Sequence, residues 1–177
     1  MKGKVYLIPS TIGEYDPAEV LPAPVLRTAC SLKTFVVEEL RTARRFLSAA
    51  GLKGQIDTLE FHVLNEHTSQ QEVEALAALF DKGDVGLISE AGLPAVADPG
   101  AALVALCHKH GIEVVPLVGP SSLMLALMAS GLNGQSFAFP GLPTGQDGGT
   151  TQRAQRCGAP LQVAEPEPDI HRNALPE

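Results

Sequence analysis

The sequence is poor in cysteine and aromatic residues, with no tryptophan, two tyrosines, six phenylalanines and three cysteines among 177 residues. Cys30, Cys107 and Cys157 are odd in number and widely spaced, which excludes a C-x-x-C metal or redox pair and argues against a disulfide framework. We expect reduced cysteines that serve as packing residues. No apolar run approaches the roughly 20 residues that cross a bilayer, and the first residues lack a secretory signal pattern. These absences predict a soluble cytoplasmic protein that makes no use of a membrane.

Excess positive charge is also missing. The chain has 13 Lys and Arg against 20 Asp and Glu, a formal net charge of -7, so its whole surface is not a nucleic-acid footprint. One local basic cluster could still dock RNA. Because 45% of the residues are hydrophobic, the chain can bury a core.

The composition changes near Phe139. Every Phe and Tyr lies before Pro140, whereas residues 140–177 have none and are rich in proline and glycine. Such a segment buries little apolar surface. We therefore predict a folded domain over residues 1–139 and a disordered or irregular tail over residues 140–177.

Short apolar runs alternate with helical patterns in the first 139 residues. Strands are predicted at 5–8, 35–37, 59–64, 85–88 and 112–115, and helices at 70–80, 101–110 and 121–129, with only a short helix in 15–31. Most strands are near-continuous apolar runs, which is typical of strands covered on both faces. The alternation predicts an α/β fold, a three-layer αβα unit with a mainly parallel five-stranded sheet.

In such a sheet, ligands bind beyond the carboxyl ends of the strands. Three loops follow strands there: Pro9–Gly13, Ser89–Gly100 and Pro116–Ser122. None has a G-x-G-x-x-G or phosphate-loop pattern. Asp98 is expected to cap the next helix, and the helix N-terminus after Ser121 could hold a carboxylate. Each loop alone is explained more simply by turn chemistry, but the three together indicate a ligand site.

Polar residues near the second and third strands are candidates for contact with a substrate. Arg41, Arg44 and Arg45 recur at i, i+3 and i+4, so they share a helical face that could meet phosphates. The alternative is a solvated face that pairs with Glu38 and Glu39. The histidines near the third strand and near a later helix end likewise allow a functional or a structural interpretation.

His67 follows the third strand and could contact substrate or belong to a capping segment before the next helix. His108 and His110 lie on different faces near a helix end, where surface positions are favoured over metal binding. We predict no metal site.

The loop sequences resemble a known family. The runs LISEAG at 87–92, ADPG at 97–100 and VVPLVGPSS at 114–122 closely resemble the tetrapyrrole methylase superfamily. The nearest branch resembles the ribose 2'-O-methyltransferases of 16S rRNA, of the RsmI type. Residues 38–47, EELRTARRFL, are similar to that branch's E-D-x-R-x-T-R-x-L-L motif.

Two acidic residues depart from the family pattern, since Glu39 and Glu90 stand where Asp is usual. These departures suggest a side branch of the family that could act on a different substrate. The resemblance covers Val5 to Phe139. It implies a two-domain, usually dimeric methyltransferase that holds S-adenosylmethionine between its domains and acts on rRNA or the small ribosomal subunit.

The resemblance also implies which residues touch the ligands; the catalytic base stays unnamed. Cofactor-binding residues would be Pro9, Thr11, Gly13, Ser89, Glu90, Ala91, Gly92, Asp98, Pro120, Ser121 and Ser122. Substrate candidates are Glu38, Arg41, Arg44, Asn65 and His67.

The tail departs from the family, which continues with a G-Y-L-P turn and an F-I-E-T-P-Y-R strand in a second domain. Residues 140–149 and 168–177 have neither motif. Codons can nevertheless be chosen for the two segments so that a shift of the reading frame by one base yields both motifs. We interpret the tail as the product of a one-base insertion near Pro140, which leaves the second domain largely missing. We then expect a weak or inactive methyltransferase. The alternatives are a non-catalytic remnant and a methylase of a tetrapyrrole or another small molecule.

Overall fold

The computed structural model describes residues 2–139. The chain divides into two compact units, Met1–Ser122 and a second that begins at Leu123, and each is described by itself. The predicted tail over residues 140–177 lies outside the described residues, and so does the segment that we interpret as the product of a one-base insertion.

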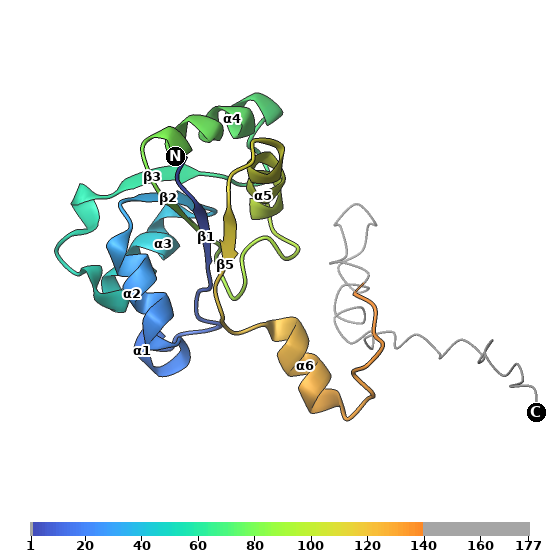
Figure 1. Cartoon of the computed structure of the whole chain (residues 1–177). Coiled ribbons are helices and arrows are strands. Elements are labelled where there is room, and N and C mark those ends of the chain that lie inside the picture. Colours follow the sequence, from blue (N-terminus) through green and yellow to red (C-terminus); the bar gives the residue numbers. More distant parts are fainter. Residues whose placement is uncertain (1, 140–177) are drawn as a thin grey trace, which may run out of the picture. The chain divides into compact units, whose positions relative to one another are not determined.

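The first unit is built on one sheet whose strand pairings are all parallel (Figure 1). Its strands are β1 (Val5–Ile8), β2 (Thr34–Val37), β3 (Glu60–Val63), β4 (Val85–Ile88) and β5 (Val114–Pro116), in the order β3-β2-β4-β1-β5. The predicted five-stranded parallel sheet is confirmed. The last strand begins two residues later than predicted, at Val114, which pairs with Val5.

Helices and helical turns connect the strands. They are α1 (Pro17–Val20), α2 (Ala23–Ser31), α3 (Leu40–Leu47), η1 (Ser48–Leu52), η2 (Ile56–Thr58), α4 (Gln70–Ala75), η3 (Leu76–Asp81) and α5 (Gly100–Lys109). The helix α6 (Ser122–Ser130) follows β5, and all of it but its first residue belongs to the second unit. The segment 15–31 holds two helices, where one short helix was predicted. Its prolines lie at helix starts, where no intrahelical N–H bond is lost: Pro17 opens α1, and Pro22 is the N-cap of α2.

Two apolar cores cover the two faces of the sheet, because successive strand residues point to opposite sides. Val36 belongs to one core together with Leu103, whereas Phe35 and Val37 belong to the other together with Phe46. The helices α4 and α5 cover one face of the sheet, and α2 and α3 cover the other (Figure 1). Each fully buried side chain of this kind stabilises the fold by about 1.5–3 kcal/mol. The predicted three layers are confirmed.

The two cysteines among the described residues, Cys30 and Cys107, are both free, as predicted. Burial raises the pKa of the Cys107 thiol to about 11, so it stays protonated at neutral pH. Cys157 lies outside the described residues. Within residues 2–139 no helix has the length and apolar character needed to span a bilayer.

Candidate functional site at the carboxyl edge of the sheet

The loops after β1, β4 and β5 pack directly against one another. The Ser10 N–H donates to the Gly92 carbonyl oxygen at 2.9 Å, and the Ser10 hydroxyl donates to the Ser89 carbonyl oxygen at 3.3 Å. A Cβ added at Gly119 would lie 2.2 Å from the Cβ of Pro9. The predicted meeting of these loops at one sheet edge is therefore present, and glycine at position 119 is required by the close approach.

Gly92 is constrained both by its backbone conformation and by its neighbours. Its φ of +73° lies in the left-handed region, and a Cβ there would lie 3.2 Å from the Pro120 carbonyl oxygen and 3.5 Å from Ile12 Cδ1. Any side chain at this position would combine backbone strain with a tight contact between two of the three loops.

Ser89 carries an unsatisfied polar group. Its side chain is 6% exposed, and its hydroxyl oxygen is buried without a hydrogen-bond partner among the described residues. An unpaired buried hydroxyl costs about 1–3 kcal/mol and therefore requires an explanation. A polar ligand atom supplied at this edge of the sheet, with a small shift of the loop, would satisfy it.

Asp98 organises the rest of the loop after β4. Its Oδ1 accepts hydrogen bonds from the N–H groups of Gly100 at 2.6 Å and Ala95 at 3.3 Å. It thus caps the start of α5, as predicted, although the helix is assigned Pro99 as its N-cap residue. Ala95 and Ala97 have φ of 65° and 54°, a conformation that alanine rarely adopts. The Asp98 contacts hold this strained segment.

Glu38 joins β2 to the same loop. Its Oε2 accepts a hydrogen bond from the Glu90 N–H at 3.2 Å, and the Asp98 carboxylate lies close enough to interact with it electrostatically. Desolvation raises the pKa of Glu38, and the neighbouring Asp98 and Glu90 carboxylates raise it further, against the lowering effect of the Glu90 N–H. Glu38 therefore holds a proton to a higher pH than an ordinary glutamate.

A groove of about 470 Å³, here the Glu38 groove, lies beside this carboxylate. It is lined by Glu38, Glu39, Asn65, Glu66, His67, Glu90, Ala97, Asp98 and Pro99. Three substrate candidates from the sequence, Glu38, Asn65 and His67, thus meet two cofactor candidates, Glu90 and Asp98. Proposed substrate and cofactor residues share one surface.

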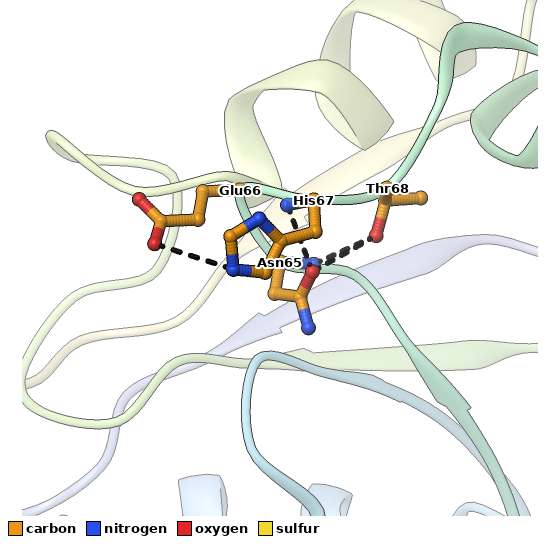
Figure 2. Close-up of polar contacts among 4 residues, drawn as sticks. All are labelled: Asn65, Glu66, His67 and Thr68. Atoms are coloured by element: carbon orange, nitrogen blue, oxygen red, sulfur yellow. Dashed lines mark hydrogen bonds and ion pairs between the residues drawn. The ribbon is translucent and has the colours of Figure 1, made fainter.

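The turn that carries His67 is shown in Figure 2. The Asn65 side-chain oxygen accepts a hydrogen bond from the His67 N–H at 3.0 Å, and the Thr68 hydroxyl accepts one from the Asn65 N–H at 3.0 Å. The His67 ring is exposed and lies 3.6 Å from Glu66 Oε1. The segment is a hydrogen-bonded turn ahead of α4, and it also lines the Glu38 groove, so both sequence interpretations stay compatible with it.

The three arginines of α3, Arg41, Arg44 and Arg45, do not form one common contact surface. Arg44 forms an ion pair with Asp57, rather than with Glu38 or Glu39, and its guanidinium lies over the Phe61 ring, 5.9 Å from the centroid. Arg41 is exposed near the start of the helix. Arg45 instead lines a second groove. The structure therefore separates Arg44, which has structural partners, from the other two.

The second groove, here the Tyr15 groove, has a volume of about 480 Å³. It is lined by Thr11, Gly13, Glu14, Tyr15, Pro17, Thr42, Arg45, Phe46, Ala49, Glu90 and Ala91. Glu90 lines both grooves. Sequence reasoning missed Glu14 and Tyr15, although an aromatic residue directly after a ligand-type loop is a signal that could have identified Tyr15.

The last cofactor candidates lie at the end of the first unit. Pro120 contributes the carbonyl that faces Gly92, and Ser122 is the first residue of α6, most of which belongs to the second unit. Binding of a carboxylate at that helix start stays a prediction. Over residues 2–139 no group of three or more His, Cys, Asp or Glu has an arrangement suited to a metal ion.

Comparison with known proteins adds evidence of a different kind. No family model matches the chain. Three proteins, each named ribosomal RNA small subunit methyltransferase I, are similar to it. The Escherichia coli O157:H7 protein is 32% identical over 141 residues, covering 79% of this chain and 46% of the relative. The Vibrio cholerae protein is 35% identical over 138 residues, covering 77% and 45% respectively.

The Mesorhizobium japonicum protein is 36% identical over 138 residues, which cover 77% of this chain and 44% of the relative. The chain thus spans less than half the length of the curated relatives it matches. The matches agree with the motifs after β2, β4 and β5. By these relatives and motifs, the chain is similar over 77–79% of its length to proteins named ribosomal RNA small subunit methyltransferase I, which is consistent with a domain of the tetrapyrrole methylase type.

Proposed function

We propose that this chain belongs to an S-adenosylmethionine-dependent methyltransferase that methylates a ribose 2'-hydroxyl in small-subunit ribosomal RNA. The observation that carries the proposal is the packing of three small-residue loops around the unsatisfied Ser89 hydroxyl. The names of the relatives support RNA as the acceptor. A cytoplasmic location follows from the substrate, and a homodimer is part of the same proposal through the family resemblance.

The residues present fit the cofactor. Ser89 to Gly92 have small or exposed side chains that leave the backbone open, and the Ser89 hydroxyl lacks a partner among the described residues. Ser89, Gly92 and Pro120 would hold S-adenosylmethionine, with Thr11 and Gly13 at the neighbouring loop. When bound, this cofactor supplies a methyl group made electrophilic by its sulfonium. The protein must then align the acceptor oxygen with that group and exclude water.

A ribose hydroxyl is a poor nucleophile, so a base at the acceptor would accelerate the transfer. Glu38 is the carboxylate best suited among those described. It borders the Glu38 groove, and its raised pKa, caused first by desolvation, makes it a stronger base than an ordinary glutamate. Its role would be to accept the hydroxyl proton, while the Glu90 N–H fixes the carboxylate.

The decisive experiment is mass spectrometry of 16S rRNA from cells with and without the frame-restored gene, in which the second domain is present. We expect one ribose methyl group that disappears with the gene and returns when it is restored. A strain that carries Glu38→Gln should fail to restore the methyl group although the protein accumulates. An unchanged set of ribose methyl groups would refute RNA methylation by this protein.

A small-molecule acceptor is the second candidate, and the acidic lining of the Glu38 groove favours it. Glu38, Glu39, Glu66, Glu90 and Asp98 all line that groove, and such a surface repels the phosphates of RNA. If the rRNA is unchanged, labelled methyl transfer to the small-molecule fraction of a cell extract would identify this alternative.

A further inference from the structure

The Tyr15 groove is built around an aromatic ring held in a fixed turn. The side chain of Tyr15 is 62% exposed in spite of its size. A Cβ at Gly13 would lie 3.3 Å from Tyr15 Cε2, so the ring packs over that glycine. The Tyr15 N–H donates to the Gly13 carbonyl oxygen at 3.1 Å, and the Thr11 hydroxyl donates to the same oxygen at 3.1 Å. The ring therefore offers a face to solvent without being free to collapse.

The other walls of the groove carry complementary chemistry. Phe46 of α3 is 8% exposed and supplies an apolar surface. Arg45, one residue before it, forms no ion pair within residues 2–139, unlike Arg44. Glu14 and Glu90 add carboxylates that accept hydrogen bonds. One groove thus combines an aromatic face, a cation and two acceptors.

We propose that the Tyr15 groove binds one nucleotide of single-stranded RNA, with its base on the Tyr15 ring and its phosphate at Arg45. This inference rests on the proposed function and specifies its substrate site. Single-stranded RNA is recognised mainly through unstacked bases that stack on aromatic rings, together with basic groups on the backbone. The volume of about 480 Å³ falls within the roughly 300–1,000 Å³ of small-ligand sites.

The carboxylates of Glu14 and Glu90 are consistent with a site for a nucleotide and inconsistent with a site for phosphate groups alone. Glutamate accepts hydrogen bonds from exocyclic amino groups of bases, as it does from cytosine. Glu90 lines both this groove and the Glu38 groove. A nucleotide whose base lies on Tyr15 would therefore direct its ribose toward Glu90 and the proposed base, Glu38.

Tyrosine fluorescence provides a direct assay, because the chain has no tryptophan and only two tyrosines, Tyr6 and Tyr15. In a Tyr6→Phe background Tyr15 is the sole strong emitter. We expect single-stranded RNA trinucleotides to quench its emission in a saturable way. Absence of quenching by trinucleotides of every base composition would overturn the inference.

Variants assayed by dialysis of labelled trinucleotide separate the contributions. Tyr15→Ala should weaken binding about tenfold, and Tyr15→Phe should retain it, because stacking needs only the ring. Arg45→Ala should weaken binding and reduce the slope of log K against log salt by about 0.7. Arg27→Ala is the control, since Arg27 is an exposed arginine of α2 that does not line the groove. Equal losses for Arg27→Ala and Arg45→Ala would contradict a defined phosphate contact.

Binding of S-adenosylmethionine, measured separately, distinguishes failure of this inference from failure of the proposed function. If the cofactor binds and the trinucleotides do not, the inference is wrong and the methyltransferase proposal stands. If the cofactor competes with the trinucleotides, the groove belongs to the cofactor and the inference is also wrong. If neither binds, the proposed function itself is contradicted.

Discussion

Substitution of Gly92 separates the role of the loop cluster from simple backbone strain, since the chain offers a matched control. Gly92 and Gly54 have similar φ, +73° and +82°, but only Gly92 has neighbours. A Cβ at Gly92 would lie 3.2 Å from the Pro120 carbonyl oxygen, whereas a Cβ at Gly54 would find nothing within 4 Å. Alanine in the left-handed region costs about 1–2 kcal/mol at either position.

We therefore expect Gly92→Ala and Gly54→Ala to lower the free energy of unfolding by about 1–2 kcal/mol each, with the Gly92 variant at the upper end. The two should differ in ligand binding. Gly92→Ala displaces the Pro120 loop by a few tenths of an ångström and should weaken S-adenosylmethionine binding, and Gly92→Leu should abolish it. Gly54→Ala should leave binding unchanged. Urea unfolding and titration calorimetry measure the two effects.

Unchanged affinity in Gly92→Leu, with the protein folded, would move the cofactor site away from this edge of the sheet. Equal loss of affinity in Gly92→Ala and Gly54→Ala would mean that general destabilisation, and not the loop contact, governs binding.

Three further predictions concern the core, a helix cap and a carboxyl group. Leu103→Ala removes a side chain that is 0% exposed, and it should cost about 2–5 kcal/mol in urea unfolding. Ser69→Ala removes the hydroxyl that accepts a hydrogen bond from the Glu72 N–H at the start of α4 and leaves the backbone N–H of residue 69 bonded to the Glu72 carboxylate; it should cost about 1 kcal/mol in the same assay. No change would show that the cap is dispensable. Glu38→Gln should stabilise the fold at pH 7 but not at pH 3.5. The folded-state pKa of Glu38 is raised, so its favourable contribution is complete below its unfolded pKa of about 4.3 and is lost as pH rises through the folded pKa. A stability difference between Glu38→Gln and wild type that is independent of pH would contradict this assignment.

The sheet was predictable because its central strands are covered on both faces. Val85–Ile88 is a continuous apolar run and is fully buried between two helical layers, so pattern and position agree. The segment 15–31 was less predictable, because proline disrupts a helix interior but favours a helix start, and the sequence pattern alone did not locate the start at Ala23.

The candidate site was predictable only in outline. Loops after parallel strands must meet at one edge, so the convergence of Pro9, Gly92 and Gly119 follows from topology. The different partners of the α3 arginines do not follow from topology, because Arg44 contacts Asp57 and Phe61, which lie outside the helix and beyond its 3.6-residue pattern. Helical spacing places residues on a face but does not identify what opposes them.

The central claim is that the loops after β1, β4 and β5 hold S-adenosylmethionine, and amide chemical-shift mapping tests it most directly, since it detects weak binding residue by residue. A titration of the ¹⁵N-labelled chain with S-adenosylmethionine should shift the amide signals of Thr11, Gly13, Ser89 and Gly92 in a saturable way and leave that of Gly54 in place. The largest shifts at the β3 edge of the sheet, around His62, or no shifts at millimolar cofactor, would contradict the account.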